Sequence, residues 1–357
     1  MVILHIAAIQ DTKFSGVGVV VPKHVLCQQA SNTVGFINIF NIEIEDIQNQ
    51  LTYRRGMKIQ ELPSPFNKPE IVIFHELYYI DFLYLYKDVY KNNIPFIIVP
   101  HGGLTKQAQS IKKLKKKVAN ILLFIYFFNK ATAFHFLSEA ERNESLDVAD
   151  SFIIPNGMTL KSNTLKTIEN TTFTYIGRIS IFHKGLDLLI EGVCKIKDYL
   201  ENNDVTINIY GPENEDSIVL KKMISRYGLE NIISINGPVT DQNKLNILLG
   251  TTYFIQTSRF EGVPMGILEA LSYGIPCCVT EGTNLSQYIE MYNAGFTSDC
   301  DSNSISKMII KAVNNKSMLQ DMHANSKQLI LDNFSWDMIS KKYMDTYTEI
   351  IDKQRRR

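Results

Sequence analysis

Two glutamates, Glu261 and Glu269, lie where a predicted strand gives way to a predicted helix, and seven residues separate them. Because proline is tolerated in the first turn of a helix, we expect a helix to begin near Pro264. Free backbone N–H groups at such a helix start can bind phosphate or sugar oxygens. Two carboxylates at different depths can bind different hydroxyl-bearing parts of one ligand. The alternative interpretation makes Glu261 a helix cap and Glu269 a surface residue.

Two cations occupy a similar setting earlier in the chain. Arg178 follows a predicted strand at 173–176, and Lys184 lies at the start of the next predicted helix. An arginine fork and a lysine point charge can bracket a diphosphate. Their charge would also stabilise negative charge that grows on a leaving diphosphate. Taken alone, an arginine and a lysine in loops are more often ordinary surface residues.

Two segments of the first half could meet the same kind of ligand. Gly16 belongs to the run S-G-V-G after the first predicted strand, where backbone can approach a phosphate, but a tight turn is the alternative. The third glycine of the dinucleotide fingerprint is missing, which disfavours a nicotinamide dehydrogenase. His101 follows a predicted strand at 96–99 and could donate to a phosphate or sugar oxygen, or be a structural histidine bonded to a carbonyl.

Short β-branched runs alternate with longer amphipathic segments along the chain, a pattern typical of βαβ units and parallel sheets. The predicted strands lie at 2–9, 34–39, 71–75, 96–99, 131–136 and 152–155, and then at 173–176, 205–210, 232–236, 253–257 and 276–280. The sequence therefore predicts an α/β protein with two doubly wound domains, 1–160 and 165–337, joined by a polar linker. Ligands bind beyond the carboxyl ends of such strands, so we expect a cleft between the domains.

The segment from Ser258 to Ala270 reads S-R-F-E-G-V-P-M-G-I-L-E-A and is followed by G-I-P at 274–276. It resembles the signature of the retaining GT4-like glycosyltransferases, the glycosyl transferases group 1, which have the GT-B fold of two Rossmann-like domains. The G-R and K-G pairs at 177–185 and the phrase P-H-G-G-L at 100–104 are similar to further motifs of that family. The likeness runs from the first-strand loop to Trp336.

The resemblance implies roles for individual residues. Glu261 would contact hydroxyls of the donor sugar, and Glu269 would contact the ribose of the nucleotide. Arg178 and Lys184 would bind the pyrophosphate, and His101 would contact the transferred sugar and polarise the reaction centre. Gly16 would contact the diphosphate or the acceptor. The backbone that approaches the sugar and diphosphate would be that of Gly262, Val263, Pro264 and Met265.

The same resemblance implies a retaining, metal-independent glycosyltransferase without a cofactor. Its co-substrate would be a nucleotide-diphosphate sugar, with UDP- and GDP-sugars as first candidates, and its acceptor a saccharide such as a polyprenyl-diphosphate-linked glycan. The implied pathway is assembly of bacterial capsule, lipopolysaccharide O-antigen or exopolysaccharide. A sugar-nucleotide-binding protein without transfer activity and a non-hydrolysing epimerase stay open. A phosphorylase would need a longer chain and a cofactor-binding lysine.

Composition narrows the classes further. The 357 residues include 37 basic and 37 acidic side chains, so the chain lacks the broad positive field of nucleic-acid-binding proteins. Five cysteines without metal-type spacing, and no recognisable signal peptide, predict a reduced, cytoplasmic protein. The D-x-D match at Asp299 and Asp301 is a common chance pattern that we assign to a surface turn, so no metal site is predicted.

A lysine-rich segment and the C-terminal helix complete the predictions. Six lysines lie between Lys106 and Lys117, ahead of an apolar run at 118–128 that is too short to cross a bilayer. The lysines could rest on anionic lipid at the inner membrane face, or form the solvated end of a core helix. By resemblance, a helix at 338–357 packs back on the first domain, with Trp336 as a packing anchor and a frayed arginine-rich end.

Overall fold

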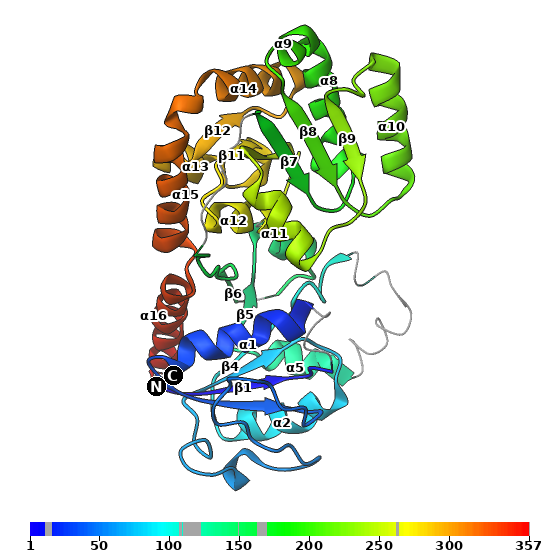
Figure 1. Cartoon of the computed structure of the whole chain (residues 1–357). Coiled ribbons are helices and arrows are strands. Elements are labelled where there is room, and N and C mark those ends of the chain that lie inside the picture. Colours follow the sequence, from blue (N-terminus) through cyan, green and yellow to red (C-terminus); the bar gives the residue numbers. More distant parts are fainter. Residues whose placement is uncertain are drawn as a thin grey trace. The chain divides into compact units, whose positions relative to one another are not determined.

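The structure is a computed structural model that describes residues 1–10, 16–106, 109, 123–148, 150–162, 170–261 and 264–356. It divides into two compact units. Unit 1 comprises Met1–Gly157 together with Trp336–Arg357, and unit 2 comprises Met158–Ser335. Figure 1 shows the elements of each unit.

Unit 1 is built on a parallel sheet with the strand order β2-β1-β3-β4-β5-β6. The strands are β1 (Val2–Ala7), β2 (Thr33–Asn38), β3 (Ile71–His75), β4 (Phe96–Val99), β5 (Ala133–Phe136) and β6 (Ser151–Ile153). The described helices are α1 (Gly16–Gln29), η1 (Ile59–Glu61), α2 (Ile80–Lys91), α5 (Ile125–Lys130), α6 (Glu139–Glu144) and α16 (Trp336–Arg355). Helices α1 and α16 pack together on one face of the sheet, and α2 and α5 cover the other (Figure 1).

The alternation of side chains along the strands decides which helices each face meets. Ile71 and Ile73 of β3 lie in the core beneath α1 and α16, while Val72 and Phe74 lie in the core beneath α2 and α5. Both sets are fully buried, as expected for strands covered on two faces.

Unit 2 is built on a second parallel sheet, with the order β12-β11-β10-β7-β8-β9. Its strands are β7 (Thr172–Ile176), β8 (Thr206–Tyr210), β9 (Ile233–Asn236), β10 (Tyr253–Gln256), β11 (Cys277–Thr280) and β12 (Gly295–Ser298). Its helices are α7 (Ile181–Lys184), α8 (Leu186–Lys195), α9 (Lys197–Asn202), α10 (Glu215–Tyr227), α11 (Asp241–Leu249), α12 (Met265–Ser272), η3 (Glu281–Thr283), α13 (Ser286–Tyr292), α14 (Ser302–Asn314), η4 (Lys316–Met318) and α15 (Leu319–Asn333).

The strand order of unit 2 contains a switch point. The first strand, β7, has β8 on one side and β10 on the other, so the chain reverses its direction of travel across the sheet between β7 and β10. Loops that leave the carboxyl ends of these two strands diverge, and open α/β sheets bind ligands in the space between them. Unit 1 has the equivalent point between β1 and β3.

The predicted fold class, two doubly wound parallel-sheet α/β domains, is confirmed. One strand was missed: β12, whose sequence G-F-T-S has a single large apolar side chain, a weak signal for an edge strand. The predicted domain ranges also differ in detail, because Leu160 belongs to unit 2 and Trp336 to unit 1.

Two other predictions concern membranes and the chain end. In the part of the chain that the structure describes, no helix is both long enough and apolar enough to cross a membrane. Most of the segment from Lys106 to Lys117 lies outside the described residues.

The expectation of a frayed end is wrong for Arg355, which belongs to α16 and forms an ion pair with Glu70 at 3.0 Å.

Candidate functional site

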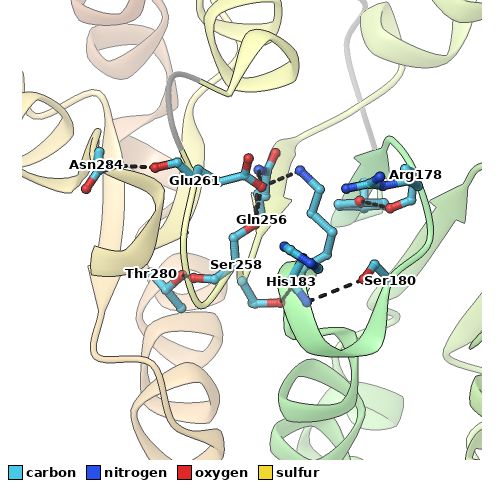
Figure 2. Close-up of polar contacts among 11 residues, drawn as sticks. Arg178, Ser180, His183, Gln256, Ser258, Glu261, Thr280 and Asn284 are labelled. Carbon is cyan, nitrogen blue, oxygen red and sulfur yellow. Dashed lines mark hydrogen bonds and ion pairs between the residues drawn. The ribbon is translucent and has the colours of Figure 1, made fainter. Parts of the chain in front are cut away.

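The Glu261 carboxylate, in the segment after β10, is held by three donors on one oxygen (Figure 2). Ser258 Oγ donates to Oε1 at 2.7 Å, and Gln256 Nε2 donates to the same oxygen at 3.0 Å. The Lys184 ammonium forms an ion pair with it. The Lys184 and Glu261 side chains are 17% and 15% exposed, so the pair is only weakly screened by solvent. Two residues 77 positions apart thus form one charged site beside the switch point.

Side-chain and backbone contacts hold the two loops of this site together. Thr257 Oγ1 donates to the carbonyls of Lys184 and Gly185 at 3.2 and 3.1 Å. Arg259 forms a two-pronged ion pair with Asp187, at 2.8 and 2.7 Å, and its backbone N–H donates to a carbonyl of α7. Planar guanidinium and carboxylate groups fit each other in this geometry, which fixes their relative orientation. The end of β10 and the start of α8 therefore form one rigid block.

Gly185 is a position in this block that tolerates no side chain. Its φ is +58°, and a Cβ at this position would lie 2.1 Å from the Thr257 carbonyl oxygen. We expect Gly185→Ala to lower the free energy of unfolding by about 2 kcal/mol or more, from left-handed strain and the clash. The measurement is the midpoint of urea unfolding. Gly237→Ala is the matched control, because a Cβ there meets nothing within 4 Å. Equal midpoints for the two variants would contradict this account.

Arg178 lies two residues beyond β7, and its side chain is exposed. The Tyr175 hydroxyl donates to the Arg178 carbonyl at 2.7 Å, which shapes the turn. Burial raises the pKa of Tyr175; the Glu261 charge raises it further, and the Arg178 charge opposes this. Both charges therefore act on the Tyr175 phenol, and Figure 2 draws Arg178 and Glu261 in the same close-up of the site.

The second glutamate has a partner that the sequence analysis missed. Glu269, in α12, forms an ion pair with Lys244 of α11, and the two side chains are 27% and 29% exposed. Nothing in the sequence around Lys244 marks it, because it lies on a polar helix far from any motif. Unit 2 therefore has a partly buried lysine–glutamate pair in addition to Lys184–Glu261.

The helix predicted near Pro264 begins at Met265, with Pro264 as the residue that precedes it in extended conformation. Pro264 is buried, and Met265 is 42% exposed. Gly262 and Val263, predicted to approach the sugar and diphosphate, lie outside the described residues.

Residues 159–329 match the family model described as Glycosyl transferases group 1. Unit 2 belongs to this family. An uncharacterised glycosyltransferase of Methanocaldococcus jannaschii is 26% identical over 181 residues, 50% of this chain and 45% of the relative. The match thus spans under half the length of that relative.

Solved structures share the fold of the whole chain. Sucrose-phosphate synthase from Thermosynechococcus elongatus superposes with a TM-score of 0.64 at 15% identity, covering 99% of both chains. HepE of Anabaena, solved in complex with UDP and glucose, has a TM-score of 0.61 at 16% identity and covers 98% of this chain and 100% of its own. At sequence identities this low, the superpositions show a shared fold and nothing more. For unit 2, that fold is the one of the Glycosyl transferases group 1 family.

Gly16 has a different setting from the one predicted. The tight-turn interpretation is wrong, because Gly16 is the first residue of α1 and Gly18 lies within the same helix. The pattern misled because glycine disfavours helix interiors, and the packing of Val21 and Val25 under the sheet outweighs that preference here. Gly16 does follow β1 in the chain, as expected, and its contact with a diphosphate or an acceptor stays a prediction.

His101 of unit 1 is the second residue after β4 and has a φ of +48°, a conformation that is uncommon for residues other than glycine. Its Nε2 lies 3.1 Å from Nδ1 of His75, the last residue of β3. Burial lowers the pKa of His101 well below its ordinary value, so the ring is neutral at pH 7. The alternative of a histidine bonded to a carbonyl is not what the structure has: the partner is another histidine.

The D-x-D match has a structural role. Asp301 is the N-cap of α14 and accepts from the backbone N–H groups of Asn303 and Ser304, at 2.8 and 3.0 Å. Such caps satisfy N–H groups at the start of a helix. Among the described residues, no group of three or more histidine, cysteine, aspartate or glutamate side chains could hold a metal ion.

Proposed function

We propose that the chain is a retaining glycosyltransferase that moves a sugar from a nucleotide-diphosphate donor to a saccharide acceptor. The observation that carries the proposal is the Lys184–Glu261 pair beside the switch point of a group 1 domain. A cation suits the diphosphate of such a donor, and a carboxylate suits the hydroxyls of its sugar. The site thus offers a cation for the diphosphate and a carboxylate for the sugar, the two parts of the donor that separate when the bond between them breaks.

In the proposed reaction the acceptor oxygen attacks the anomeric carbon on the face from which the diphosphate departs. The bond from that carbon to the acceptor oxygen forms as the bond to the phosphate oxygen breaks, and the acceptor's proton passes to the leaving diphosphate. Lys184 and Arg178 stabilise the charge that develops on the diphosphate. Within the described contacts, the three donors to Glu261 all bind Oε1, so Oε2 can accept from a sugar hydroxyl. Glu261 therefore positions the sugar.

The donor is proposed to be a UDP- or GDP-sugar, and HepE, which shares the fold, was solved with UDP and glucose. A panel of sugar nucleotides, each incubated with and without saccharide acceptors, tests the function. We expect release of nucleoside diphosphate from at least one donor, with the same anomeric configuration in product and donor by NMR. Undiminished activity with a chelator is expected of a metal-independent enzyme. Binding without turnover would support a silent binding protein, and interconversion of two sugar nucleotides would support an epimerase.

Glu269 is proposed to bind the ribose, with Lys244 holding its carboxylate in place. We expect Glu269→Gln to raise KM for the donor about tenfold while kcat changes less than threefold, because a hydrogen bond to a non-reacting part of the donor contributes equally before and during reaction. Steady-state kinetics measure both constants. Glu201→Gln, which alters an exposed pair with Lys197, is the control. A change in kcat alone would argue against ribose binding.

We also propose that the enzyme contacts the inner face of the bacterial membrane, where a polyprenyl-diphosphate-linked acceptor of surface polysaccharide assembly would be found. The segment from Lys106 to Lys117 has six lysines. Beyond it, Leu123, Ile125 and Tyr126 are 50%, 38% and 64% exposed. Apolar side chains next to a basic segment favour binding to anionic lipid.

Vesicle sedimentation tests this contact. We expect binding to vesicles with anionic phosphatidylglycerol, little binding to pure phosphatidylcholine, and at least tenfold weaker binding when three lysines become glutamine, since each lysine near the surface contributes about 1 kcal/mol. The variant changes Lys112, Lys113 and Lys115. A control variant changes three exposed lysines of unit 2, Lys221, Lys222 and Lys307. Equal vesicle binding by the two variants would show that the lysine segment does not contribute to membrane binding.

A further inference from the structure

Five of the seven histidines of the chain gather on one face of the unit 1 sheet, beneath α1 and α16. They come from parts of the chain far apart in the sequence: β1, α1, the end of β3, the second residue after β4, and β5. Four are almost completely buried, with exposed fractions of 0 or 1%. Only His101 among them reaches partial exposure. The five residues are His5, His24, His75, His101 and His135.

Three of these rings form a single line of hydrogen bonds. His101 Nε2 lies 3.1 Å from His75 Nδ1, and His75 Nε2 lies 2.8 Å from His5 Nδ1. The line ends inside the unit, where His5 Nε2 lies 3.0 Å from Oε1 of Gln28, which is fully buried. Each ring uses both nitrogens except His101, whose Nδ1 takes no part in the line.

The two other buried histidines stand outside this line. His24 Nε2 lies 3.0 Å from Asn156 Oδ1, and His135 Nε2 donates to the Ile154 carbonyl at 2.7 Å. They share the burial of the line but not its connectivity. His24 and His135 therefore show how burial affects the pKa of a histidine that does not belong to the line.

Neutral rings make the line directional. Burial lowers the pKa of His5 to about 3 and the pKa of His75 and His101 well below 6.5, so each ring carries one N–H and one lone pair. With the Gln28 amide oriented as it is here, its carbonyl oxygen faces His5 and can only accept, so His5 donates through Nε2 and accepts at Nδ1. His75 and His101 must then do the same. This leaves the lone pair of His101 on Nδ1.

We propose that His5 and His75 are positioning residues that hold His101 in its Nε2–H tautomer, so that Nδ1 accepts a hydrogen bond from a hydroxyl of the transferred sugar. The role toward sugar rests on the proposed function. His101 is thereby an acceptor for a sugar hydroxyl, and not the donor to a phosphate or sugar oxygen that its sequence position suggests.

The backbone around His101 is also held. The residue after it, Gly102, has a φ of +79°, and its N–H donates to Glu141 Oε1. The other oxygen of Glu141 accepts from the Leu137 N–H at 2.7 Å. Strained backbone persists only where its surroundings determine it, and such positions concentrate at functional sites. Ring and backbone of His101 are thus both fixed.

Nitrogen NMR of the full chain labelled with ¹⁵N-histidine tests the line without any ligand. Long-range ¹H–¹⁵N correlations distinguish the two tautomers of each ring. We expect the Nε2–H form for His5, His75 and His101 at pH 7.5. An Nδ1–H form, or a mixture of forms, at His101 would overturn the proposal even if the enzyme is active. If no donor is turned over, the proposed function fails, while this spectrum still reports on the line.

Gln28→Met tests the positioning role from the inner end of the line, where His5 and His75 separate Gln28 from His101. In this variant His5 Nε2–H has no acceptor. Reversing the direction of the hydrogen bonds in the line then lowers the free energy, because a buried lone pair is less costly than a buried N–H without a partner. We expect His101 to become mainly Nδ1–H and turnover to fall about tenfold, with an unchanged dissociation constant for nucleoside diphosphate. His135→Phe, which keeps the stacking on Phe152, should retain the Nε2–H form of His101 and turnover within twofold. Wild-type turnover in Gln28→Met would overturn the positioning role.

Discussion

Replacing Lys184 by alanine is expected to lower turnover at least about 100-fold. A preorganised positive charge that meets the developing charge of a leaving group contributes on the order of 3 kcal/mol to catalysis, and such residues cost roughly 100- to 1,000-fold in rate when removed. Here the loss is larger than that of a simple contact, because Glu261, which is 15% exposed, would keep its negative charge without the Lys184 cation beside it. That charge would repel the incoming diphosphate. Initial rates of nucleoside diphosphate release at saturating acceptor measure the effect.

The partner of Lys184 provides the discriminating variant. Glu261→Gln keeps the shape of the side chain but removes its charge, and we expect a smaller loss, about tenfold, because Glu261 positions the sugar and does not act as a nucleophile. Lys221→Ala is the control, since Lys221 forms an exposed ion pair with Glu213 in the same unit and should leave turnover within twofold. If Lys184→Ala were as active as Lys221→Ala, the site assignment would be wrong.

Acid is expected to unfold unit 1 at a pH where most proteins are stable. Burial lowers the pKa of His5 and His135 to about 3 and that of His24 to about 4, whereas the unfolded chain titrates near 6.5. Below pH 6.5 the unfolded state therefore binds more protons than the folded state, and stability falls as pH falls toward 4. The cost begins only near pH 6.5, where the unfolded histidine takes up its proton, so each such histidine costs about 1.4 kcal/mol in all between pH 7.5 and 5.5, and three remove about 4 kcal/mol.

The single tryptophan of the chain makes this measurable for one unit. Trp336 packs against His24, with ring centroids 5.4 Å apart, and belongs to unit 1. Its fluorescence during urea unfolding at a series of pH values reports on the packing around His24 in unit 1. We expect the free energy of unfolding to drop steeply below pH 6.5, and the slope to become shallower in His135→Phe. A free energy that stays level from pH 7.5 to 5.5 would show that the buried rings are not held neutral.

The sequence was most informative where chemistry depends on local motifs. Strand ends and the helix start at Met265 follow from apolar runs and from Pro264, and both lie close to their predicted positions. Lys184 and Glu261 were each assigned to the donor, but their ion pair was not predicted. It depends on the crossover that brings β10 beside β7, which local patterns do not encode.

Residues without a motif were harder to predict. Lys244 lies on a polar helix, and only the tertiary fold shows that it meets Glu269. His5 and His135 do carry a signal, since each is a polar residue inside an otherwise apolar strand that must be buried. Buried polar groups require partners, so these positions could have been identified as members of a polar cluster. Which ring bonds which, however, follows from the strand register.

Titration of UDP and of GDP into the wild-type chain and into Lys184→Ala, followed calorimetrically, tests the central claim that the Lys184–Glu261 site holds the diphosphate of the donor. We expect the wild type to bind at least one of the two, and its dissociation constant to rise at least tenfold in Lys184→Ala, because a charge-assisted hydrogen bond is worth about 1.5 to 3 kcal/mol. Glu261→Ala should bind the same diphosphate no more weakly than the wild type. Wild-type affinity in Lys184→Ala, or no binding of either diphosphate by the wild type, would contradict the account.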